Sequence, residues 1–467
     1  MTMLAGPLAH LDERFAEYVE RLKGLARIPS VSAQGFPPEE VVRSAEAVAS
    51  ELRRAGLENV RRITQTDGHP YAYGEWLHAP GAPTVLLYAH HDVQPPGRPE
   101  VWETPPFEPT VRADGRLYGR GVADDKAGVM MIVASIESFL ASGTRLPVNV
   151  RVIIEGEEEV GSGHLEDFIR ENRDLLAADV LVIADTGNLE EGLPSITCQL
   201  RGLVAVDVEV AGLEGRIHSG EWGGAVPDPL MAMCKILSRL VDEDGVPCEP
   251  DMRAGVRESP EAVRRRMRAL PFDEAEFARK AGLLPGVRLA GEKAYSVHER
   301  LWTRPSLTIV ALEGSPIAGA SNQIVESARA RVTVRIVPEQ DPVAVLGALV
   351  AALRRDPPWG VQVRTRALST GLWWSTDPTG PAFEAAVRAL QAGYGREPAV
   401  IGAGGSIPFV KPFQDALGGV PALLFGVEDP KGRAHGENES VGLADWGKAI
   451  RSTIHLYGEL APLKKLK

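Results

Sequence analysis

Histidine and acidic residues recur in this sequence just after short apolar runs. His90 and Asp92 follow "TVLLYA", Asp185 follows "VLVIA", and Glu158 and Glu159 follow "VNVRVIIEGE". Imidazole nitrogens and carboxylate oxygens are ligands of zinc-type divalent ions, whereas calcium sites lack the histidines. The pattern therefore predicts a metal site whose ligands come from several segments of the chain.

The stretch "YAHHDVQP" contains a candidate ligand and a residue that could orient it. Residues two apart on an extended strand share a face, so Asp92 can accept the second imidazole N–H of His90. His91 points to the opposite side, where we expect packing or a surface contact. The pattern is weak by itself, because His10 and Asp12 repeat it in a charge-rich helical segment that we expect on the surface.

Two further acidic stretches allow both a structural and a chemical interpretation. Asp124 and Asp125, in "GRGVADDKAG", could cap the following helix, or one could bridge cations while its neighbour shapes the loop. The run 157–159 could be a solvated loop. Alternatively, one of its carboxylates binds metal and an adjacent one accepts a proton from metal-bound water, whose pKa the ion lowers towards ~7. His435, a lone loop histidine, could equally lie on the surface.

The elements that would carry these residues alternate between strand and helix patterns. Strand-like runs cover 84–90, 147–156 and 178–185, and an apolar helix is expected at 127–143. This alternation predicts an α/β fold with a mostly parallel sheet, in which sites form at the carboxyl ends of the strands.

The pattern changes near residue 200. "LVAVDVEVAG" and "SARARVTVRIVP" alternate apolar and polar residues, as half-exposed antiparallel strands do. The α/β rhythm resumes towards the C-terminus, and 467 residues are too many for one core. We therefore predict a discontinuous catalytic domain, 1–199 and 373–467, interrupted by an α+β domain at 200–372.

Composition excludes several other classes of protein. The net charge of −12 argues against nucleic acid or an anionic membrane as a partner. No secretory signal and no apolar run approaching ~18 residues is found. Three scattered cysteines, Cys198, Cys234 and Cys248, fit a reducing cytoplasm and exclude a thiolate zinc cluster.

The order of the motifs resembles that of the co-catalytic di-zinc dipeptidases and aminoacylases. This family includes carnosinases, carboxypeptidase G, acetylornithine deacetylase and succinyl-diaminopimelate desuccinylase. The similarity runs from residue 25 almost to the C-terminus and is greatest to the carnosinase-like dipeptidase branch. The motifs that carry it are "YAHHDVQP", "GRGVADDKAG", "EGEEEVGS", "IHSGEWGG", "LWTRPSLTIVALEG", "GGSIPF" and "AHGENES".

The resemblance implies two divalent ions, most simply zinc, with manganese or cobalt as alternatives. The residues that match their ligands are His90, Asp124, Glu159, Asp185 and His435. Asp124 would bridge the ions, with a cis peptide bond to Asp125. Asp92 would hold the ring of His90, and Glu158 would be the general base. Glu157 matches a variable position, where we expect a solvated side chain.

The family's inserted domain is a lid that also forms a homodimer. His218 resembles the lid histidine that reaches the partner's active site and stabilises the oxyanion. Asn322 and Arg335 match positions that contact the substrate, and Ser406 matches a loop that binds its C-terminal carboxylate. From the residues alone, His218 could also be a satisfied loop residue and Arg335 could pair with a surface acid.

The predicted activity is hydrolysis of the amide bond of dipeptides or related amides that carry a free C-terminal carboxylate. A hydroxide bridging the ions would attack the carbonyl, with Glu158 as general base. One alternative substrate class is N-acyl amino acids, of the acetylornithine or succinyl-diaminopimelate type. Gly402 and Ala403 stand where carnosinase-type enzymes often carry Arg-Glu, so a specificity contact differs. A second alternative is a non-catalytic binding protein that keeps the fold.

Overall fold

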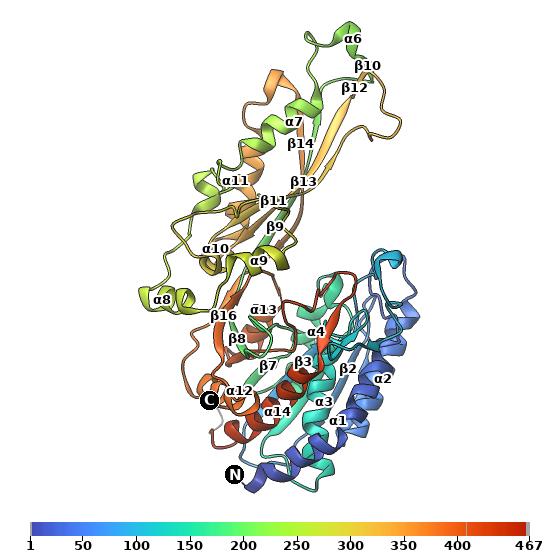
Figure 1. Ribbon diagram of the computed structural model, residues 1–467, viewed down its shortest axis with the longest axis vertical. Helices are drawn as coiled ribbons and strands as arrows, with labels where there is room; N and C mark the ends of the chain where they lie inside the picture. Colours follow the sequence, from blue (N-terminus) through green and yellow to red (C-terminus); the bar gives the residue numbers. More distant parts are fainter. Residues whose placement is uncertain (1, 408, 464–467) are drawn as a thin grey trace. The chain divides into compact units, whose positions relative to one another are not determined.

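The computed structural model describes residues 2–407 and 409–463 (Figure 1). The chain divides into two compact units. Unit 1 comprises Met1–Cys198, Thr376–Ile401 and Phe409–Lys467, and unit 2 comprises Gln199–Ser375 and Gly402–Pro408. Among the described residues, no helix combines the length and the apolar character needed to cross a membrane.

Unit 1 is an α/β structure built on a mixed sheet. Its helices and short 3-10 turns are η1 (Thr2–Leu4), α1 (Ala5–Ala26), α2 (Pro38–Arg54), η2 (Pro99–Val101), α3 (Lys126–Ala141), η3 (Glu158–Val160), α4 (Leu165–Glu171), α5 (Arg173–Leu176), α12 (Pro381–Tyr394), α13 (Val410–Ala416) and α14 (Leu443–Leu460). Its strands are β1 (Glu58–Ile63), β2 (Tyr71–Trp76), β3 (Thr84–His90), β4 (Thr110–Val111), β5 (Arg116–Tyr118), β6 (Asn149–Glu155), β7 (Val180–Ile183), β8 (Ser195–Leu200), β16 (Ala399–Ala403), β17 (Ala422–Leu424) and β18 (Ser440–Gly442).

The strands of unit 1 in the main sheet follow the order β1–β2–β6–β3–β7–β17–β8, and β16 pairs with β8. The central pairs β6–β3, β3–β7 and β7–β17 are parallel, whereas β1–β2, β2–β6 and β17–β8 are antiparallel. The sequence prediction of an α/β fold with a mostly parallel sheet is confirmed. A separate small sheet, β18–β5–β4, brings the C-terminal part of unit 1 beside β5.

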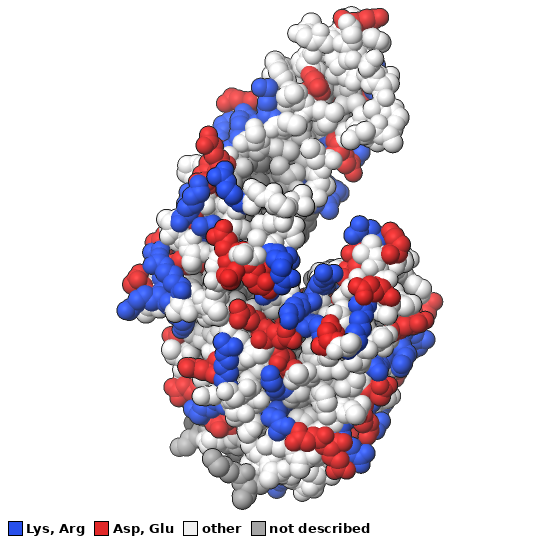
Figure 2. All heavy atoms as spheres, in the orientation of Figure 1, with Lys and Arg blue, Asp and Glu red and all other residues white. Residues whose placement is uncertain are grey.

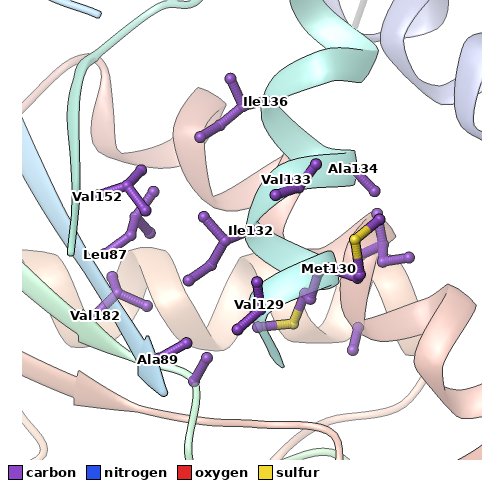
Figure 3. Close-up of a cluster of buried hydrophobic side chains, with 14 of the residues drawn as sticks. Leu87, Ala89, Val129, Met130, Ile132, Val133, Ala134, Ile136, Val152 and Val182 are labelled. Carbon is purple, nitrogen blue, oxygen red and sulfur yellow. The ribbon is translucent and has the colours of Figure 1, made fainter. Parts of the chain in front are cut away.

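The core of unit 1 lies between the parallel strands and α3 (Figure 3). Ile132, Val133 and Ile136 of α3 are fully buried, as are Leu87 of β3 and Val152 of β6. Helices α1 and α14 also pack on α3. A helix buried on nearly all sides has an apolar sequence without a polar stripe, which matches "AGVMMIVASIESFLASG".

Unit 2 is an α+β structure with an antiparallel sheet in the order β11–β13–β9–β14. Its strands are β9 (Gly202–Ala211), β10 (Ile217–His218), β11 (Ser306–Glu313), β12 (Gln323–Ile324), β13 (Ser327–Ile336), β14 (Gln362–Gly371) and β15 (Trp374–Ser375). Its helices and 3-10 turns are α6 (Ser219–Trp222), α7 (Pro229–Ser238), η4 (Pro250–Arg253), α8 (Glu261–Ala269), α9 (Glu274–Lys280), α10 (Val297–Thr303), α11 (Pro342–Arg354) and η5 (Pro358–Gly360).

One face of the four-stranded sheet carries the core of unit 2, because burial alternates along β9 and β13. Helices α7 and α11 cover that face. The other face is polar, with arginines such as Arg331 paired to Asp207. On the side of the molecule seen in Figure 2, basic and acidic side chains are interspersed over much of the surface.

Candidate metal centre

The candidate ligands gather where three adjacent parallel strands end. His90 is the last residue of β3, Asp185 follows β7 by two residues, and Glu158 and Glu159 form the turn η3 just after β6. Because β6, β3 and β7 are neighbours and parallel, their carboxyl ends lie at one edge of the sheet. Asp124 joins them from the loop before α3.

Two groups of ligand atoms share Asp124. In the first, His90 Nε2 lies 2.9 Å from Asp124 Oδ1 and 3.7 Å from Asp185 Oδ1. In the second, His435 Nε2 lies 3.0 Å from Asp124 Oδ2 and 3.1 Å from Glu159 Oε2. Each oxygen of the Asp124 carboxylate therefore faces a different group, as a carboxylate that bridges two ions requires.

The donor set fits two divalent cations. The ligand atoms of each group lie within 4.8 Å of one another, and tetrahedral ligands about 2.1 Å from zinc stand about 3.4 Å apart. Burial alone would lower the pKa of His90, but Asp124, Asp185 and Asp92 outweigh burial and raise it well above its ordinary value. The buried carboxylates thus stabilise positive charge in the site, and bound metal ions would supply that charge.

Asp92 connects the histidine to the glutamate turn. The Nδ1 of His90 lies 3.1 Å from the carbonyl oxygen of Asp92 and 3.4 Å from its Oδ1. The same carboxylate accepts hydrogen bonds from Ser32 Oγ and from the backbone N–H groups of Glu158 and Glu159, at 2.6, 3.2 and 3.1 Å. The nearer acceptor for the imidazole is thus the backbone carbonyl of Asp92, with the carboxylate that the spacing predicted slightly farther away, and that carboxylate also anchors the turn that carries Glu158.

Glu158 stands beside both groups in a crowded acidic environment. Burial, followed by the charges of Asp185 and other carboxylates, raises the pKa of Glu158 well above its ordinary value. A carboxylate whose pKa is raised in this way is a stronger proton acceptor than an ordinary glutamate, which is the property that a general base needs.

Glu157 corrects one expectation from the sequence, which placed it in solvent. The side chain is only 3% exposed. Its carboxylate accepts hydrogen bonds from Tyr71 Oη and from the backbone and ring of His164. A run of three glutamates gives no sign of which one has partners, because those partners come from distant parts of the chain.

His91 and Asp125, which adjoin the candidate ligands His90 and Asp124, make hydrogen bonds to the backbone. His91 is fully buried, its Nε2 hydrogen-bonds to the carbonyl of Pro70, and burial lowers its pKa to about 4, so it packs as the strand alternation indicates. Asp125, which is joined to Asp124 by a cis peptide bond as the resemblance implies, makes no side-chain cap on α3. Its carboxylate instead accepts a hydrogen bond from the backbone N–H of His90, at 3.3 Å.

In unit 2 the predicted substrate residues form two separate pairs. Arg335 Nη1 donates to Ser406 Oγ at 2.8 Å. His218 pairs with Gln323 in the β10–β12 ladder, and just beyond it the N–H of Ser219 donates to the carbonyl of Asn322. Asn322 precedes β13 and Arg335 lies near the end of that strand, so the two pairs are about 30 Å apart along it.

Arg201 is a member of the Arg335 cluster that the sequence motifs did not reveal. Its Nε donates to the carbonyl of Gly404 and its Nη1 to Ser306 Oγ, both at 3.0 Å. Burial and the charge of Arg335 lower its pKa to about 10. Within the described part of the chain, no carboxylate lies at ion-pair distance from either guanidinium, so the cluster is suited to bind an anion.

Comparison with known sequences identifies the family to which these features belong. The sequence model of "Peptidase family M20/M25/M40" matches residues 86–458. The chain belongs to this peptidase family. It is therefore a metal-dependent hydrolase of amide bonds, and the recognition of the carnosinase-like dipeptidase branch from sequence motifs is confirmed.

Relatives of this M20 peptidase resemble it over almost the whole chain. The cysteinylglycine-S-conjugate dipeptidase of Corynebacterium striatum is 34% identical over 402 residues, 85% of each chain. The beta-Ala-His dipeptidase of Rattus norvegicus is 30% identical over 475 residues, 97% of this chain and 95% of the relative. The structure of the dipeptidase Dug1p from Saccharomyces cerevisiae superposes with a TM-score of 0.87 at 26% identity and covers 99% of this chain and 100% of Dug1p.

Proposed function

We propose that this M20 peptidase is a dipeptidase with two metal ions, which hydrolyses the amide bond next to a free C-terminal carboxylate. The observation that carries the proposal is the pair of imidazole–carboxylate groups that share Asp124, with Glu158 beside them. The relatives named above are called dipeptidases, which favours dipeptides over the N-acyl amino acids that the sequence left open.

When bound, two divalent ions would polarise the scissile carbonyl and acidify the attacking water. His90, Asp124, Glu159, Asp185 and His435 would hold them. Glu158 accepts the proton of the attacking water and passes it to the leaving amine. The backbone N–H of Glu158 donates a hydrogen bond to Asp92 Oδ1 at 3.2 Å. This hydrogen bond keeps the base in place through both proton transfers.

We further propose that Arg335 and Ser406 bind the substrate's C-terminal carboxylate. Two guanidiniums that have no carboxylate partner among the described residues supply the positive charge, and Arg201 holds the backbone of the loop from which Ser406 projects. A substrate carboxylate bound there would neutralise the positive charge of Arg201 and Arg335, which no described carboxylate of the protein neutralises.

The test is a hydrolysis panel of free dipeptides, C-amidated dipeptides and N-acyl amino acids, each run with and without a chelator. Free dipeptides should be the best substrates, and Arg335→Gln should lower their kcat/KM by about 10–100-fold, because a hydrogen bond to a charged group contributes about 1.5–3 kcal/mol. Arg331→Gln is the matched control, since Arg331 lies on the same strand but pairs with Asp207. Equal rates on amidated and free dipeptides would rule out the carboxylate site.

We also propose that the chain forms a homodimer through unit 2, in which His218 and Asn322 serve the partner's active site. Their distance of about 30 Å from Arg335 along β13 separates them from the carboxylate cluster of their own chain. The described surface of unit 2 exposes apolar side chains suited to an interface, among them Trp222, Leu312 and Ile317. Few charged side chains are visible around α6, β10 and β12 in Figure 2.

Mixing two inactive variants tests this arrangement. Glu158→Gln and His218→Ala chains should each be inactive alone, and subunit exchange between them should restore activity, because a mixed dimer contains one site with both residues intact. A sedimentation mass of one chain, or no restored activity after proven exchange, would contradict the dimer with shared sites. We also propose that zinc is the native metal and that the protein is cytoplasmic.

A further inference from the structure

A buried ion pair lies directly behind the metal centre. Arg120 Nη1 donates to Glu439 Oε2 at 2.7 Å, and the two residues are 1% and 0% exposed. Neither aligns with a ligand nor with the general base. Burying two charged side chains costs free energy, which their mutual attraction offsets only when further hydrogen bonds satisfy their remaining polar atoms. Glu439 and Arg120 make such hydrogen bonds to two different loops.

Glu439 binds the loop that presents Asp124. Its Oε2 also accepts the backbone N–H of Gly121 at 2.8 Å, and its Oε1 accepts those of Ala123 and Asp124 at 2.9 and 3.1 Å. Both carboxylate oxygens are thus used twice. The path of the backbone into Asp124, and hence the direction of its side chain, is set by this one carboxylate.

Arg120 binds the loop that presents His435. Its Nη2 donates to the carbonyl oxygens of His435 and Gly436, each at 3.1 Å, and to that of Pro95. His435 itself has a φ of 64°, in the left-handed region that residues with a Cβ rarely occupy. Hydrogen bonds from a rigid guanidinium to the carbonyls of this loop keep it in that conformation.

We propose that the Arg120–Glu439 pair positions Asp124 and His435 relative to each other, and thereby maintains the metal group formed by Asp124, Glu159 and His435. The other group depends on it less, because His90 ends a strand in the centre of the sheet and Asp185 closely follows the neighbouring strand. This inference rests on the proposed function in assuming two ions per chain.

Glu439→Gln tests the pair with little change of shape. The amide group must place its N–H₂ against Arg120 or against backbone N–H groups, so donor meets donor on one side. Loss of residues that orient ligands typically weakens metal binding by about 10–100-fold. Titration of the metal-depleted chain with Zn²⁺ in competition with a chelator should therefore show one of the two sites weakened by that factor and the other weakened clearly less.

A matched control separates positioning from general stability. Glu137 also pairs with a buried arginine, Arg21, at 2.7 Å, but on the contact of α1 with α3, away from the ligand loops. Glu137→Gln should lower the thermal stability of the metal-depleted chain and leave both zinc affinities unchanged. If Glu137→Gln weakens zinc binding as Glu439→Gln does, or if Glu439→Gln weakens both sites equally or neither, the proposal is wrong.

Arg120→Lys provides a second variant in case Glu439→Gln does not fold. Lysine keeps the charge opposite Glu439 but loses the fork that reaches the carbonyls of His435 and Gly436, so the same site should weaken. Wild-type affinity at both sites in this variant would overturn the role of Arg120. A wild-type chain that binds fewer than two ions would instead refute the proposed function, which keeps the two failures distinct.

Discussion

Replacing Glu158 by Gln should lower kcat by about 10²–10⁴-fold while both metal ions remain bound, because general acid–base catalysis contributes about that factor. Glutamine has nearly the same shape but accepts no proton at neutral pH. The backbone of residue 158 stays bound to Asp92, so the turn should keep its conformation. Steady-state kinetics and metal analysis by mass spectrometry on the same preparation would measure both quantities.

Glu157→Gln is the control for this prediction. Glu157 is the adjacent glutamate, yet its carboxylate hydrogen-bonds to Tyr71 and His164 and is not among the candidate ligand groups. Its replacement should cost stability and leave kcat within a few-fold of wild type. A Glu158→Gln enzyme that keeps wild-type turnover, or a loss of metal together with activity, would remove Glu158 from the role of general base.

Replacing Asp124 by Ala should have the broadest effect on the metal centre. Each group then keeps only two protein ligands, His90 with Asp185 and Glu159 with His435. Three or four protein ligands are the rule for zinc sites, so both ions should be lost together with activity. Metal content measured after dialysis should fall from two ions per chain to well below one.

Single-site variants make this prediction specific to the shared ligand. His90→Ala should remove one ion and leave the second group intact, whereas Asp124→Ala should remove both. His10→Ala is the matched control, because it changes the other H-x-D histidine, which lies on α1 and should have no effect on metal content. Equal metal loss in the Asp124 and His90 variants would show that Asp124 does not bridge two sites.

Local sequence patterns predicted the parts of the protein that depend on neighbouring residues. Apolar runs predicted the strands β3, β6 and β7 and the buried helix α3. Acidic residues placed just after those strands predicted that their side chains meet at one edge of a parallel sheet. The spacing of His90 and Asp92 predicted that the two residues lie close together, although Asp92 stands just beyond β3 and its backbone carbonyl is the nearer acceptor.

The errors and omissions have a common physical origin. Glu157 was expected in solvent, but its partners lie in other segments and bury it. Arg201 and Ser406 are about two hundred residues apart, and nothing in either neighbourhood shows that Arg201 binds the carbonyl of Gly404. The hydrogen bonds of Glu439 to the loop before Asp124 likewise join segments about three hundred residues apart.

The sequence by itself therefore determined the fold class, the family and the kind of chemistry, since these follow from periodicity and from motifs in a fixed order. Only the tertiary structure decided which carboxylate oxygen faces which histidine, which glutamate of three binds Tyr71 and His164, and which arginines have no acidic partner in the described part of the chain. Those features depend on distances of about 3 Å between side chains that are distant in sequence, and burial and charge, which decide their energies, exist only once the chain has folded.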